Sequence, residues 1–126
     1  MSISAGFVGL YALLLTLLAI YVSMGRIKYR ISLGDGGNDD LQRRRRSHGN
    51  AVEHAVIMIP LVMLYEMRNG NIAFLVVISY GFLLLRVFHA TSLIASPVSK
   101  TRRITSGLSY LAEVVLAVAL VLTLLR

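Results

Sequence analysis

The sequence predicts an all-α membrane protein, folded as a bundle of four transmembrane helices. Its 126 residues are 56% hydrophobic, and the mean hydropathy of +0.72 is typical of membrane proteins rather than soluble ones. The apolar residues form four long runs, with most charged residues between them or at their ends. A soluble domain of this size would leave much of that apolar surface in water. We therefore expect a single four-helix membrane domain over residues 1–126.

The first apolar run predicts a helix over residues 3–24, since it contains no charged residue. At about 1.5 Å per residue, this helix is long enough to cross a hydrocarbon core of roughly 30 Å. Residues 25–40 are rich in glycine, aspartate and basic residues and are predicted to form a loop. The glycines and aspartates lack the spacing of an EF-hand, so no metal site is expected there.

The other three helices are predicted over residues 40–68, 72–95 and 102–125. The Asn69-Gly70 pair is a turn signal after the second helix, and Ser96-Pro97 is expected to end the third. We find no repeat at a fixed period and no low-complexity segment. Cysteine is absent, which excludes disulfides, thiolate metal sites and a cysteine nucleophile.

The basic residues indicate a membrane surface as the partner of this chain. They give a formal net charge of +7 and lie beside the apolar runs, without the exposed aromatic residues that nucleic-acid binding would favour. Most lie before the second and fourth helices, and only Arg68 and Arg126 lie at the opposite helix ends. The positive-inside rule therefore predicts that the two basic segments are cytoplasmic and that both termini face the other side.

Polar side chains continue into the spans as stripes on three helices. On the second helix Arg43, Arg46, Asn50 and Glu53 stand at offsets of 0, 3, 7 and 10 residues, which places them on one side. Similar stripes are formed on the third helix by Arg86 and His89, and on the fourth by Arg102, Ser106, Ser109 and Glu113. All three stripes begin at the same face of the membrane, where we expect the functional site.

Buried charges in a membrane are costly and usually paired. Counting residues from the helix ends puts Arg86 and Glu113 both roughly 14 to 16 Å deep and Glu53 roughly 10 Å deep. We therefore expect Arg86 to pair with Glu53 or Glu113 and to fix the register of the helices. His54 or His89 could join the same network.

The run of four arginines divides into two pairs. Arg44 and Arg45 point away from the polar stripe and are predicted to rest on anionic lipid head groups. Arg43 and Arg46 continue the stripe at a helix N-terminus, where the macrodipole favours anions and disfavours cations. A bound anion would relieve that conflict, and the planar guanidinium can grip a carboxylate with two hydrogen bonds.

These residues carry a resemblance to a known family. The segment Arg43-x-x-Arg46-x-His48-x-Asn50-x-x-Glu53 resembles the signature of the MAPEG superfamily, the membrane-associated proteins in eicosanoid and glutathione metabolism. The third helix carries a motif similar to that family's, Arg86-Val87-Phe88-His89, and the fourth begins with one that resembles it, Arg102-Arg103-Ile104-Thr105. The similarity extends over nearly the whole chain in length, helix count and placement of polar residues.

The resemblance implies a four-helix subunit of a homotrimer in a bacterial inner membrane, with glutathione as co-substrate bound between neighbouring subunits at the cytoplasmic side. By position, Arg46, Asn50 and Glu53 would hold glutathione, and Arg102 or Arg103 would hold its sulfur as the thiolate. The supporting residues would be Lys28 and Arg43, which add positive field, and Arg86 and His89. The second substrate would be lipophilic and would arrive through the bilayer.

Three functions are weighed against one another. A glutathione transferase or peroxidase fits the motifs, whereas Leu93 and Ser106 stand where eicosanoid-forming members carry tyrosines, which disfavours eicosanoid chemistry. A non-catalytic protein that binds acidic lipid or a partner would also use the basic face, so enzymatic activity stays an open question. A small multidrug exporter is disfavoured because the first helix has no acidic residue for proton exchange.

Overall fold

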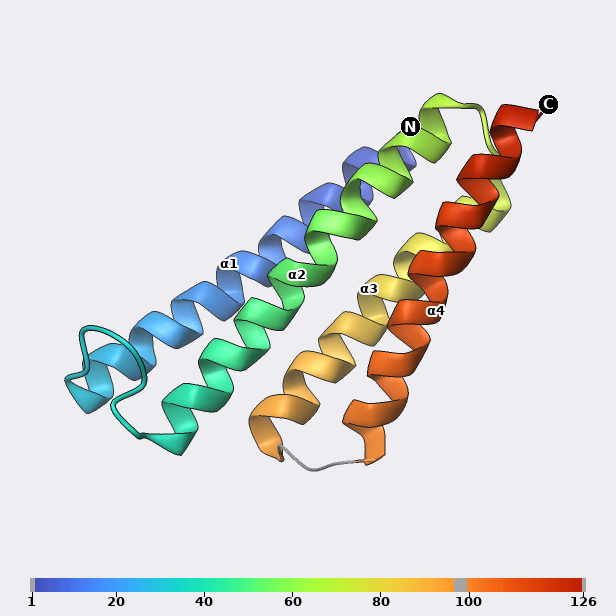
Figure 1. Ribbon diagram of the computed structural model, residues 1–126. Coiled ribbons are helices and arrows are strands. Elements are labelled where there is room, and N and C mark those ends of the chain that lie inside the picture. Colours follow the sequence, from blue (N-terminus) through green and yellow to red (C-terminus); the bar gives the residue numbers. More distant parts are fainter. Residues whose placement is uncertain (1, 97–99, 126) are drawn as a thin grey trace.

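A computed structural model, describing residues 2–96 and 100–125, contains four long helices packed side by side (Figure 1). Helix α1 spans Ile3–Tyr29, α2 Asp39–Met67, α3 Ile72–Ala95 and α4 Lys100–Leu122, with a short 3-10 turn, η1, over Thr123–Leu125. All four helices are long and apolar enough to cross a membrane. The prediction of an all-α, four-helix architecture is confirmed. Pro97, expected to end the third helix, and Arg126, one of the basic residues counted for orientation, lie outside the described residues.

Both chain ends lie at one end of the bundle, and the α1–α2 loop lies at the other, beside the end of α3 and the start of α4 (Figure 1). The two basic segments of the sequence therefore lie at the same end of the bundle, as expected if the three polar stripes begin at one face of the membrane. Helix α2 packs against each of the other three helices. Its polar face is consequently in a position to meet side chains from α1, α3 and α4.

Helix α1 is longer than the sequence predicts, because it continues to Tyr29 rather than ending near Met24. Arg26 and Lys28 lie in its last turn, where cations interact favourably with the carbonyl end of the helix dipole. The helix ends at Tyr29 and is capped by Arg30, which adopts a left-handed conformation with φ of 54°. Hydropathy placed the end too early, because it reports where the apolar residues stop and not where the hydrogen bonds stop.

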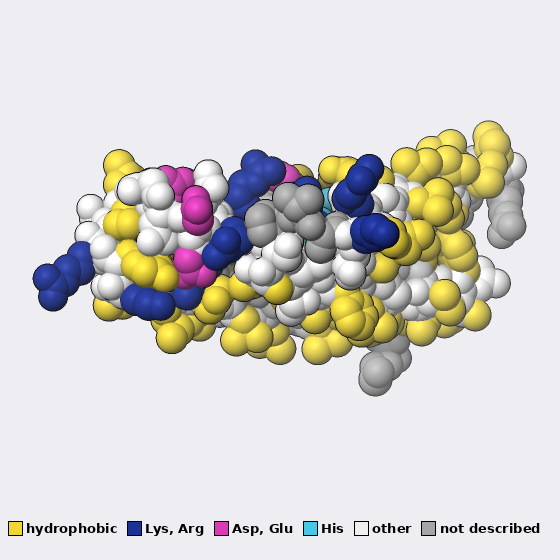
Figure 2. Space-filling model, turned by 90° about the horizontal axis from the view of Figure 1, so that it is seen from below, with side chains coloured by type: hydrophobic (Ala, Val, Ile, Leu, Met, Phe, Trp, Pro, Cys, Tyr) yellow, Lys and Arg dark blue, Asp and Glu magenta, His cyan; other side chains and the backbone are white. Residues whose placement is uncertain are grey.

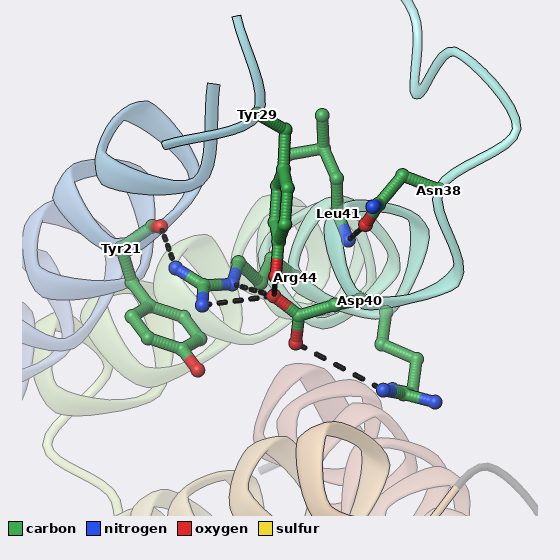
Figure 3. Close-up of polar contacts among 7 residues, drawn as sticks. Tyr21, Tyr29, Asn38, Asp40, Leu41 and Arg44 are labelled. Atoms are coloured by element: carbon green, nitrogen blue, oxygen red, sulfur yellow. Dashed lines mark hydrogen bonds and ion pairs between the residues drawn. The ribbon is translucent and has the colours of Figure 1, made fainter. Parts of the chain in front are cut away.

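The structure contradicts the prediction that the Arg44 side chain rests on lipid head groups. Its side chain is buried and turns toward α1, as Figure 3 shows. Its Nε and Nη2 atoms each lie 2.9 Å from Oδ2 of Asp40, and Nη1 donates to the carbonyl of Tyr21 at 3.1 Å. The guanidinium also lies 3.9 Å from the centre of the Tyr21 ring, a cation–π geometry. The side chain thus joins the two helices.

Asp40 and Gly25 complete this contact between α1 and α2. The Asp40 carboxylate also accepts a hydrogen bond of 2.9 Å from the Tyr29 hydroxyl (Figure 3). A Cβ atom at Gly25 would lie 3.0 Å from Cδ of Arg44 and 3.1 Å from a methyl carbon of Leu41. Glycine therefore allows the close approach in which Arg44 reaches the backbone of α1.

Glu66 joins the same two helices at their opposite ends. Its carboxylate accepts hydrogen bonds from the backbone amides of Ile3 at 2.7 Å and Ser4 at 2.9 Å, and from the Ser2 hydroxyl at 2.9 Å. The first turn of α1 contains no acidic residue of its own. A negative charge at a helix N-terminus satisfies free amides and complements the dipole, and here α2 supplies it.

An apolar cluster fills the bundle between these two polar ends. Its fully buried members come from all four helices: Phe7, Tyr11, Met58, Val62, Leu75, Phe82 and Leu116. Many other Leu, Ile and Val side chains point outward and are exposed, as lipid contact requires. The polar stripes enter this core from the end that carries the α1–α2 loop.

Because of the contact between Arg44 and Asp40, we expect Arg44 to contribute more to the stability of the fold than its neighbour Arg45. Arg44→Ala should lower the free energy of unfolding by about 1 to 3 kcal/mol, because it removes the nearest charged partner of a partly buried carboxylate and the hydrogen bond to the Tyr21 carbonyl. Arg45→Ala is the matched control: its ion pair with Asp35 is exposed, so its loss should cost less than about 1 kcal/mol. Thermal unfolding in detergent measures both, and equal losses would contradict this role for Arg44.

Candidate functional site

Two cavities, each of about 440 Å³, lie at the basic end of the bundle and adjoin at α2. We name them the first cavity, between α1 and α2, and the second cavity, between α2, α3 and α4. Arg46 and Asn50 line both of them. Seen from below, Lys and Arg side chains lie over the left and middle of the molecule with a few acidic ones among them, and hydrophobic side chains cover its right (Figure 2).

The second cavity brings together most of the predicted site. Its lining residues are Arg46 and Asn50 from α2, His89 and Leu93 from α3, and Arg102, Arg103, Ser106, Gly107 and Tyr110 from α4. Three arginines thus line one cavity, and none of the described lining residues is acidic. Such a field favours an anionic ligand, and arginine forks match carboxylates in geometry.

The first cavity has a mixed charge. Its basic lining side chains, Arg26, Arg45, Arg46 and His48, stand with the acidic Asp35 and Glu53 and the amides Gln42 and Asn50. Glu53 is exposed on the outer side of α2, and it does not line the second cavity. This cavity suits a group with charges of both signs.

Arg86 fixes the orientation of the Asn50 amide. The Arg86 side chain is 1% exposed, and its Nη1 donates to Oδ1 of Asn50 at 3.2 Å. Because a guanidinium can only donate, the oxygen of Asn50 must face Arg86, and its NH₂ group is left for the cavities. A ligand group beside Asn50 must therefore be an acceptor, such as a carbonyl or a carboxylate.

The predicted ion pair of Arg86 with Glu53 or Glu113 is not what the structure shows. Glu113 instead lies 2.6 Å from Nδ1 of His54, both side chains are buried, and Glu53 is exposed. Within the described part of the chain, the Nε and Nη2 atoms of Arg86 have no hydrogen-bond partner. Counting residues gave similar depths, but depth does not reveal which side of α2 faces inward.

Other predicted residues fall around the cavities rather than in them. Lys28 is exposed, with its ammonium 5.0 Å from the centre of the Tyr29 ring, and Arg43 lies 3.9 Å from Asp40. Neither lines a cavity, whereas His89 does and has its Nδ1 within 3.2 Å of the Thr105 hydroxyl. Among the residues that the structure describes, no cluster of three His, Asp or Glu side chains could hold a metal.

Sequence reasoning did not assign Arg26, Gln42 or Tyr110 to the site. The longer α1 carries Arg26 to the first cavity, and Gln42 lies there at the start of α2. Tyr110 lines the second cavity and is 56% exposed. Its spacing of four residues from Ser106 on α4 was the available signal, since Ser106 belongs to the predicted stripe.

The chain is similar to proteins already described. The sequence model of the MAPEG family matches residues 4–122. Inner membrane protein YecN of Escherichia coli strain K12 is 43% identical over 69 residues, which are 55% of this chain and 53% of that relative. YecN of E. coli strain CFT073 matches with the same values. The chain thus spans about half the length of the curated relatives it matches, and no solved structure matches it significantly.

Because two of the nitrogen donors of Arg86 have no hydrogen-bond partner among the described residues, we expect its replacement to change the stability of the protein only slightly. Arg86→Met should change the free energy of unfolding by no more than about 1 kcal/mol, because the loss of one hydrogen bond is offset by removing a buried charge. Chemical or thermal unfolding of the detergent-solubilised protein measures this. A loss of about 3 to 5 kcal/mol would instead show that Arg86 is paired with a carboxylate.

Proposed function

Since the chain belongs to the MAPEG family, we propose that it binds glutathione and uses the thiolate in a transferase or peroxidase reaction on a lipophilic substrate. The family includes glutathione transferases and peroxidases. The observation that carries the proposal is the second cavity, where Arg46, Arg102 and Arg103 converge without an acidic neighbour among its described lining residues. Glutathione has two carboxylates and an ionisable thiol, and this arrangement suits all three groups.

The thiol is assigned to the start of α4. A guanidinium beside a thiol favours the thiolate, which is the reactive form. Arg102 and Arg103 both line the second cavity on α4, one turn before Ser106. The donors of Asn50 and the fork of Arg46, on the facing wall, are then available for the carboxylates and amides of the peptide.

The first cavity and its exposed carboxylate support binding between subunits. An exposed Glu53 at membrane depth would be costly against lipid, whereas a neighbouring subunit and the amino group of glutathione could both cover it. Lys28 and Arg43 lie outside both cavities and would contribute positive field at the entrance. A homotrimer in which the first cavity of one subunit faces a neighbour is therefore part of the proposal.

The lipophilic substrate would enter from the bilayer along α4. Gly107 and Tyr110 line the second cavity and are exposed. They stand among exposed apolar residues of the same helix, including Ile104 and Leu111. A hydrophobic molecule dissolved in lipid could reach the thiolate on this side without crossing water. The inner-membrane relative supports that membrane as the location, with the basic end cytoplasmic.

A glutathione titration tests the proposal directly. Glutathione at one hundred times its dissociation constant should stabilise the protein by about 2.7 kcal/mol, seen as a rise in the unfolding temperature. The expected dissociation constant lies in the micromolar to millimolar range, or about −8 to −4 kcal/mol. Vesicles of phosphatidylglycerol are the comparison. Stabilisation by these vesicles, without any effect of glutathione, would favour the non-catalytic lipid-binding alternative.

The assignment of the thiolate ligand predicts the effect of two substitutions. Arg102→Ala or Arg103→Ala should abolish the ultraviolet thiolate absorbance of bound glutathione, because the neighbouring positive charge is lost. Arg68→Ala removes an equal charge at the opposite end of the bundle, away from both cavities, and serves as the matched control. An unchanged thiolate signal in both α4 variants would refute this role.

A further inference from the structure

The pair formed by His54 and Glu113 has no part in the function proposed above. It joins α2 to α4 through a contact of 2.6 Å between Nδ1 and Oε1. The two residues are 3% and 6% exposed. Apolar residues of similar volume would hold two helices together as well or better, because a buried imidazole and a buried carboxyl group must both be stripped of water. Ionisable groups placed inside a membrane span are therefore candidates for function.

The pair lies one helical turn beyond the second cavity. Asn50 lines that cavity and precedes His54 on α2 by four residues. Tyr110 also lines it and precedes Glu113 on α4 by three residues. One turn corresponds to about 5.4 Å along a helix. The Tyr110 ring also packs against the His54 ring, with 5.1 Å between their centres. Tyr110 thus contacts the cavity on one side and the buried pair on the other.

The opposite side of the pair is closed by apolar residues. One turn further along the two helices stand Met58 and Leu116, both 0% exposed. Phe82 of α3, 1% exposed, packs beside His54 at 6.1 Å between ring centres. Within the described residues, the polar route therefore ends at the pair. A proton that reaches it must come from the second cavity and return there.

The surroundings of the pair contain one further charge. Arg86 of α3 interacts electrostatically with Glu113, and His89 of α3 interacts with His54. Tyr11 of α1 and Tyr110 of α4 are further titratable groups nearby. The Tyr11 hydroxyl is engaged, since it donates to the carbonyl of Ala51 at 2.9 Å.

We propose that the His54–Glu113 pair takes up the proton that the glutathione thiol releases in the second cavity. This inference rests on the proposed function. With Glu113 ionised, Nδ1 of His54 donates to it, and Nε2 is the acceptor. The S–H bond breaks, its electron pair stays on sulfur, and an N–H bond forms at Nε2, with the Tyr110 hydroxyl or water as the relay. After the thiolate attacks, the proton returns to the product anion.

Charge balance favours the buried pair as the acceptor of the thiol proton, over release of that proton to the solvent or its transfer to His89. Transfer to His54 leaves the total charge of cavity and pair unchanged, which matters in a medium of low dielectric constant. His89 lines the second cavity itself, but it shares that space with three guanidinium groups, which oppose another positive charge. His54 instead has a carboxylate partner.

The number of protons released to solvent per thiolate formed tests this proposal. Calorimetric titrations of the full-length protein with glutathione, in two buffers of different ionisation heat, give the protons released. The ultraviolet absorbance of the same complex gives the thiolate. The wild-type ratio should lie near zero, and His54→Asn and Glu113→Gln should raise it toward one. Glu66→Gln makes the same chemical change at the far end of the bundle and should keep the wild-type ratio.

The outcomes of these titrations either support or overturn the uptake of the proton by the His54–Glu113 pair. S-methylglutathione, which has no thiol proton, sets the background that is subtracted from every titration. A wild-type ratio near one, a bound thiol that does not ionise, or a ratio near zero in both variants would overturn the proposal. A rise in His89→Asn alone would assign the proton to His89 instead. Failure of the wild type to bind glutathione would remove the proposed function itself, and this inference with it.

Discussion

The contact of Arg44 with Asp40 and the backbone of α1 determines where the neighbouring arginines point. Successive residues of a helix are separated by about 100°, so fixing one side chain toward α1 fixes the directions of the others. Arg46, about 200° further round, is turned toward the far side, where both cavities meet. A run of four like charges thereby acquires distinct positions, with one arginine buried between helices and another in the site.

The acidic residues are arranged so that the second cavity keeps an excess of positive charge. Arg44 and Tyr29 engage Asp40, Arg45 engages Asp35, and the first amides of α1 engage Glu66. Glu113 faces His54 within the bundle, and Glu53 lies on the outer side of α2. The anion binding proposed for the second cavity therefore depends as much on where the carboxylates are held as on the arginines that line the cavity.

Hydropathy and helix periodicity were enough to predict the four helices, the position of both basic segments at one end of the bundle, and the meeting of Arg46, Asn50, His89 and Arg102. Arg103 was predicted only from the resemblance to the family. Hydropathy and periodicity failed for α1, whose last turn is polar, and for Arg44. They also failed for Arg86, whose partner is an amide rather than a carboxylate. Each failure concerns the direction of a side chain or a hydrogen bond across helices. Neither is encoded in the depth or spacing of residues along one helix.

Glu66 has a consequence for how the chain enters a membrane. The amides at the start of α1 receive their acceptor from the end of α2, more than sixty residues later in the sequence. Until α2 has crossed, the first turn of α1 lacks this partner, and the buried contact at the other end of the two helices is also missing. The two helices are therefore complete only as a hairpin, which makes the hairpin, rather than α1 alone, the natural unit of insertion.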